Sequence, residues 1–170
     1  MSGITQSGGG PEIVTDAAGK DWSLSHVGPR IRRLYSAWCK ARAWAALAGS
    51  KEHESEEAHR ESRAALIEQV AAGGYDWGSP LDPRRMGAGL RAHLQSDEGK
   101  VKLLQLLLAE THGEVPVEQV VKLFVEADPE ALGDAIARCL GVDPNAKAPA
   151  ASPSSGKEKA TPAQGSPTGT

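Results

Sequence analysis

Apolar residues recur at helical spacing through most of the chain between Gly28 and Gly141, and this periodicity constrains the fold more than any other feature. Aspartate or serine caps and first-turn prolines stand where several of these periodic segments begin. We therefore predict a mainly α protein, a bundle of about five to six helices. The predicted helices begin at or near Pro29, Lys51, Asp82, Ser96, Pro116 and Asp128.

The fourth predicted helix is expected to lie at the centre of the bundle. Its segment from Val101 to Leu108 carries apolar side chains around nearly its whole circumference, which is typical of a buried helix. The fifth helix carries an apolar set that we expect to be used for packing, namely Val117, Val120, Val121, Phe124 and Val125. The predicted structural anchors of the core are Trp22, Trp38, Trp77, Leu104 and Leu107.

The second predicted helix, from Lys51 to Ala72, differs between its two halves. Glutamates crowd its first half, which has hardly any apolar residues, so we expect that half to project into solvent. Only the second half, with Leu66, Ile67 and Val70, has side chains suited to packing.

Both ends of the chain differ from the helical part. Residues 1–11 are rich in Ser and Gly and are predicted to be unstructured, and a short β-hairpin is predicted at about 13–24, with its turn at 16–19. Beyond Val142 there is no Leu, Ile, Val, Met or aromatic residue, too little apolar surface to offset the entropy of ordering. We predict one helical domain over 12–142 and a disordered tail over 143–170.

Histidines, cysteines and closely spaced glycines form metal and nucleotide sites in other proteins, but in this chain they lack the spacing that such sites need. His53 and His59 are six positions apart, so a helix does not place both on one metal ion. Cys39 and Cys139 have no further ligands nearby, and we expect both to be buried. Gly87-Ala88-Gly89 lies within a predicted helix, so we interpret it as a close helix contact and not a nucleotide loop. We predict no catalytic residue, metal site or cofactor, and hence no enzyme.

Nucleic-acid binding could rest on the cationic first helix or on the helix pair from Pro116 to Leu140. The second helix of that pair carries Glu130, Asp134 and a lone Arg138, so phosphate would repel it. The first helix lacks a stacking surface. Its aromatic residues share the apolar stripe and do not alternate with the cations, as a stacking platform for bases requires. The net charge of −3 gives no overall attraction to phosphate, and the acidic second helix could neutralise the first by packing antiparallel to it. We therefore predict a protein partner and not nucleic acid. The cations are Arg30, Arg32, Arg33, Lys40 and Arg42.

No segment has the properties of a membrane or export signal. The N-terminal stretch lacks a basic region followed by an apolar one. The longest apolar run, from Val101 to Ala109, is interrupted by Lys102 and Gln105 and falls short of the ~18 residues of a membrane span. We expect a cytoplasmic protein with no membrane partner and leave its oligomeric state open.

The segment from Gly74 to Leu123 resembles a known family. A G-Y-x-W-G loop at Gly74–Gly78 is followed by a helix, by EGKVKLLQLLL at 98–108, by HGEV at 112–115 and by VEQVVKL at 117–123. This order is similar to that of tail assembly chaperones of tailed phages and prophages, small helical proteins encoded beside the tape-measure gene. The hairpin region, 16–24, resembles the opening of some members. Two positions depart from the family pattern. The family has Thr or Ser where this chain has Pro116, and often has proline where this chain has Gly113.

The resemblance covers roughly residues 13–141, and its specific part is about 73–125. It implies a protein without catalytic residues that binds the helical tape-measure protein, or another tail protein, while the tail assembles in the host cytoplasm. Two alternatives stay open. One is a virion structural component, such as a tail or head-completion protein. The other is a regulatory or nucleic-acid-binding protein that uses the basic first helix.

Overall fold

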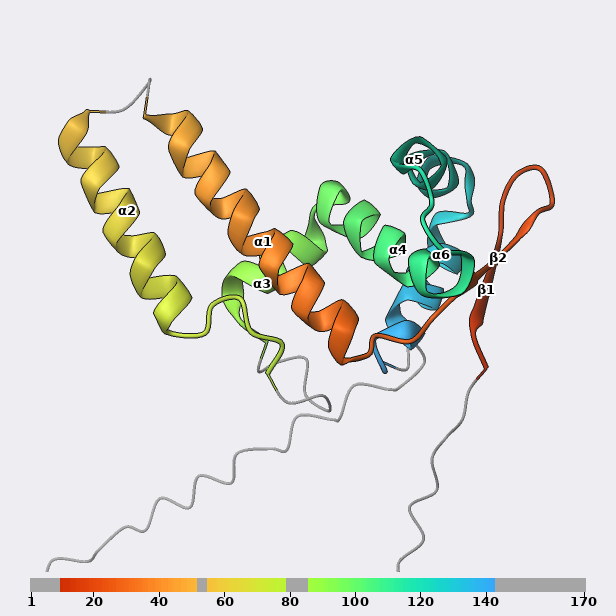
Figure 1. The fold of residues 1–170 in the computed structure, drawn as a ribbon. Coiled ribbons are helices and arrows are strands. Elements are labelled where there is room, and N and C mark those ends of the chain that lie inside the picture. The colour runs from red at the N-terminus through yellow and green to blue at the C-terminus, as the bar shows by residue number, and fades with distance from the viewer. Residues whose placement is uncertain (1–9, 52–54, 79–85, 143–170) are drawn as a thin grey trace, which may run out of the picture.

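The computed structural model describes residues 10–51, 55–78 and 86–142 of the 170-residue chain. The described part is mainly helical with an N-terminal antiparallel hairpin, as the sequence predicts (Figure 1). The predicted tail at 143–170 and most of the predicted N-terminal segment lie outside it. The elements are β1 (Glu12–Thr15), β2 (Asp21–Leu24), α1 (Pro29–Ser50), α2 (Glu56–Ala71), α3 (Ala88–Gln95), α4 (Asp97–His112), α5 (Val117–Glu126) and α6 (Pro129–Cys139).

The hairpin forms where the sequence predicts it. β1 and β2 pair antiparallel, with Val14 opposite Trp22. The carboxylate of Asp16, in the turn, accepts hydrogen bonds from the backbone N–H of Lys20 (2.9 Å) and from Nε1 of Trp22 (3.0 Å). Val14, Trp22 and Leu24 are buried, with β2 against α4 and β1 against α6. This packing is needed because two strands alone are only marginally stable in water.

The central position predicted for α4 is confirmed. The side chain of Ser96 caps the helix by accepting a hydrogen bond from the N–H of Gly99 (3.1 Å). The helix contacts β2, α1, α3 and α5. Four of its leucines are completely buried, namely Leu103, Leu104, Leu107 and Leu108.

The first half of α1 is attached to the start of α4. Ile31, Tyr35 and Cys39 form its buried face. The hydroxyl of Tyr35 donates a hydrogen bond to the carbonyl of Gly99 (3.1 Å). Figure 1 shows that α1 continues beyond this contact, with α2 alongside it on the side away from α4, α5 and α6.

Two predictions for α2 are wrong. The helix begins at Glu56, after the Ser55 cap, whereas Lys51 is the residue that caps the C-terminal end of α1. Its first half is mostly exposed, as predicted, although His59 is half-buried against α1. In the second half Leu66 is buried but Ile67 is 51% exposed. One residue turns an α-helix by roughly 100°, which carries Ile67 off the face that meets α1.

The start predicted for the third helix, at Asp82, lies outside the described residues. In the described part, Met86 and Gly87 are not helical and α3 begins at Ala88. The N–H of Gly87 donates to the carbonyl of Asp76 (2.8 Å), which joins this helix start to the turn after α2. A Cβ at Gly87 would overlap the backbone of that turn at residues 73–74, so only glycine fits. Gly87 and Gly89 do make a close contact, as predicted, but their neighbour is this turn and not another helix.

Candidate functional site

The first exposed surface is a line of three valines on α5, which we call the valine stripe. Val117, Val121 and Val125 recur every four residues and are 50%, 41% and 74% exposed. Val120 and Leu123 are the buried residues of the same helix. The prediction that the whole apolar set of α5 is used for packing is therefore wrong. The helix has more apolar circumference than its neighbours α4 and α6 cover.

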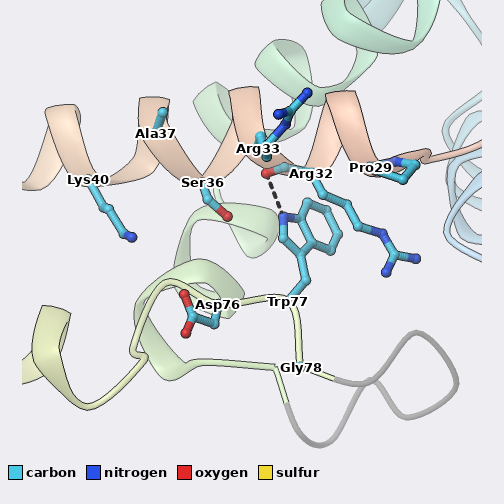
Figure 2. A pocket seen from close by; sticks show the side chains of 9 residues that line it. All are labelled: Pro29, Arg32, Arg33, Ser36, Ala37, Lys40, Asp76, Trp77 and Gly78. Atoms are coloured by element: carbon cyan, nitrogen blue, oxygen red, sulfur yellow. Dashed lines mark hydrogen bonds between the residues drawn. The ribbon is translucent and has the colours of Figure 1, made fainter.

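The second surface is a groove of about 700 Å³ between the first half of α1 and the loop at 76–78, which we call the α1 groove. Figure 2 shows α1 on one side and Asp76, Trp77 and Gly78 on the other. Nε1 of Trp77 donates a hydrogen bond to the backbone carbonyl of Arg32 (2.8 Å), which fixes the loop to the helix. The side of the groove formed by α1 consists of Pro29, Arg32, Arg33, Ser36, Ala37 and Lys40.

The cations of α1 have different surroundings. Arg30 pairs with Glu110 (2.9 Å) and Arg42 pairs with Glu98 (2.7 Å), both on α4. The sequence predicts that the acidic α2 neutralises the cations of α1. Between described residues, however, the ion pairs of α1 are made with α4 and not with α2. Arg32 and the two other cations of the α1 groove take part in no ion pair within the described part of the chain.

A third, smaller hollow of about 260 Å³ lies between α1 and α2. It is lined by Trp44, Leu47, Ala48, His59 and Arg63, and Nδ1 of His59 is buried there with no hydrogen-bond partner among the described residues. Within residues 10–51, 55–78 and 86–142, no three His, Cys, Asp or Glu side chains are grouped to hold a metal ion. The other histidine of the predicted helix, at position 53, is outside the described residues.

The buried titratable groups belong to the core. Cys39 and Cys139 are free and buried, as predicted. Burial raises the pKa of the Cys39 thiol to about 12 and that of Cys139 to about 11, so both stay protonated at neutral pH. Burial also lowers the pKa of His93, whose ring meets the edge of Trp38 at 5.5 Å.

The five predicted anchors occupy two kinds of position. Trp22, Leu104 and Leu107 are buried in the core. Trp38 and Trp77 are partly buried at its edge, each 5.7 Å from the ring of Tyr35. Trp77 therefore belongs both to the core and to the α1 groove, a position that its sequence motif does not indicate.

No protein-family model, curated protein or solved structure is significantly similar to this chain. None of the helices in the described part of the chain combines the length and apolar character that crossing a membrane requires.

Proposed function

We propose that this protein is a non-enzymatic assembly chaperone of the tailed-phage type, which binds an amphipathic helical partner such as a tape-measure protein. The valine stripe of α5 is the observation that carries the proposal. Its support from the sequence is the resemblance of residues 73–125 to that family.

The spacing of the stripe suits a helical partner. Residues four apart form the ridges that pack into the grooves of a second helix in the commonest class of helix crossing. Val117, Val121 and Val125 form one such ridge and are already exposed, so a partner does not have to unfold α5 to reach them. An amphipathic helix laid on the ridge would hide its own apolar face from water, which is how a chaperone keeps such a segment from aggregating.

The exposed area sets the size of the effect. The surface that the three valines expose together corresponds to a little more than one and a half fully exposed valines. At about 1.5 kcal/mol for a fully buried valine, covering them contributes about 2.5 kcal/mol, or roughly 70-fold in affinity. The same contact buries apolar area on the partner, which adds to this amount.

The test is co-expression of the chain with a tape-measure protein, the partner that the family resemblance implies, followed by affinity purification. We expect the two proteins to co-purify and the tape-measure protein to remain in the soluble fraction. The double variant Val121→Gln/Val125→Gln should lose most of the bound partner. Because glutamine has at least the helix propensity of valine, α5 should persist in this variant.

The matched control is Leu34→Gln/Ile67→Gln, which changes two apolar residues of similar exposure on α1 and α2. It should retain the partner. Equal loss in both variants, or no co-purification of the wild-type chain, would refute the proposal. Mass spectrometry of purified particles tests the alternative role, because a chaperone is absent from the mature virion and a structural component is present in fixed stoichiometry.

A further inference from the structure

The α1 groove holds a line of polar side chains that the valine stripe does not involve. Arg32, Ser36 and Lys40 follow one another every four residues, so they lie on one face of α1 and span about 12 Å. Figure 2 shows these three side chains on the side of α1 that faces Asp76 and Trp77. Arg33 also lines the groove, but Figure 2 shows its guanidinium on the side of α1 away from Asp76 and Trp77.

The groove is already formed in the isolated chain. The hydrogen bond from Trp77 to the carbonyl of Arg32 holds the loop to α1, and the indole ring also packs on Tyr35 at 5.7 Å. A ligand therefore meets two walls whose positions are set by the core, which lowers the entropic cost of binding.

The charges indicate an anionic ligand. Nε of Arg32 is buried and has no hydrogen-bond partner among the described residues, so no neighbouring acceptor there offsets the charge of this guanidinium. The cations elsewhere on α1, Arg30 and Arg42, are paired with glutamates of α4. Among the cations of α1, the three without an ion pair in the described part of the chain, Arg32, Arg33 and Lys40, therefore all line the α1 groove.

A protein carboxylate fits this groove better than a phosphate chain. Asp76 lines the same groove, and its carboxylate can accept an N–H from a peptide, a donor that a phosphate chain lacks. The ring of Trp77 already contacts Tyr35 and lies 5.8 Å from the guanidinium of Arg32, so it is not a free stacking platform for bases. Pro29, Ala37 and the indole supply apolar contact beside the cations.

We propose that the α1 groove binds an acidic segment of a protein partner, with carboxylates about two helical turns apart meeting Arg32 and Lys40. This inference goes beyond the proposed function, because it concerns a different surface and does not depend on which protein the valine stripe binds.

The test uses synthetic probes and the full chain. One fluorescein-labelled peptide of about 15 residues carries glutamates at helical positions i, i+4 and i+8 with leucines beside them, and a second has glutamine in place of each glutamate. Fluorescence anisotropy should show at least about tenfold tighter binding of the acidic peptide, weakening as salt is raised from about 50 to about 200 mM.

The variant Arg32→Gln/Lys40→Glu should lose this preference, and Lys40→Glu alone should weaken it without disturbing the residues around Trp77. The matched control, Arg60→Gln/Lys51→Glu, makes the same change in net charge on exposed residues away from the groove and should bind as the wild type does. Equal binding of the two peptides, or equal loss in the control variant, would overturn the proposal. So would tighter, groove-dependent binding of a labelled thymidine oligonucleotide of the same length, since that would assign the cations to phosphate.

Discussion

Replacing Gly99 by alanine tests whether the contact between α1, α3 and α4 is as close as the structure shows. Gly99 is buried near the start of α4. An added Cβ would lie 2.8 Å from the hydroxyl oxygen of Tyr35 and closer still to the carbonyl of His93. The carbonyl belongs to the backbone of α3, so no side-chain rotation relieves the overlap, and α3 and α4 must move apart.

Three contributions set the size of the effect. Overpacking in a close-packed interior costs about 2 kcal/mol, and weakening the hydrogen bond from Tyr35 to the carbonyl of Gly99 costs about 1 kcal/mol. The higher helix propensity of alanine returns up to about 1 kcal/mol. The net expectation for Gly99→Ala is a loss of about 2 kcal/mol in the free energy of unfolding.

Gly133→Ala is the matched control, since Gly133 is an exposed glycine inside α6 with nothing within 4 Å of an added Cβ. It should gain up to about 1 kcal/mol from helix propensity alone. For a domain of this size we expect Tm to fall by about 8 °C in Gly99→Ala and to rise by up to about 4 °C in Gly133→Ala. Thermal and urea unfolding followed by far-UV circular dichroism measure both. A Gly99→Ala protein as stable as the wild type would refute the packing of α4 described above.

Three further results are expected. Asp128→Ala removes the side chain that accepts the N–H of residue 131 at the start of α6 (2.8 Å) and should cost about 1 kcal/mol in urea unfolding, with Asp128→Ser much closer to the wild type. The hydrogen bond from Trp22 lowers the pKa of Asp16 below 3.8, so the contribution of Asp16 to stability is present above about pH 4 and is lost as the pH falls through the folded-state pKa. Asp16→Asn should therefore make the unfolding midpoint fall less steeply at acidic pH, and an unchanged fall would contradict the contact. Cys39 and Cys139 should resist a thiol reagent at neutral pH until the chain is unfolded, and rapid labelling of the native protein would contradict their burial.

The sequence alone determined the features that depend on neighbouring residues. The Ser96 cap, the Asp128 cap with its following proline, and the Asp16 turn each act within a few positions, so residue type and spacing are sufficient to predict them. The central place of α4 was also predictable, because leucines around a whole helix leave no face suited to water.

The tertiary structure decided features that depend on contacts distant in the chain. α3 begins at Ala88 because Gly87 meets the turn after α2, and no local signal near Asp82 contains that contact. Ile67 is exposed because α1 covers a narrower face of α2 than the apolar residues suggest.

The two candidate surfaces depend on the same distinction. Periodicity defined an apolar face on α5, but only the positions of α4 and α6 decided that Val120 is covered while Val117, Val121 and Val125 are left in water. The α1 groove exists because Trp77 is brought to the carbonyl of Arg32, forty-five positions earlier in the chain. A helix pattern specifies which residues share a face, whereas the extent to which that face is buried is set by the elements that pack on it.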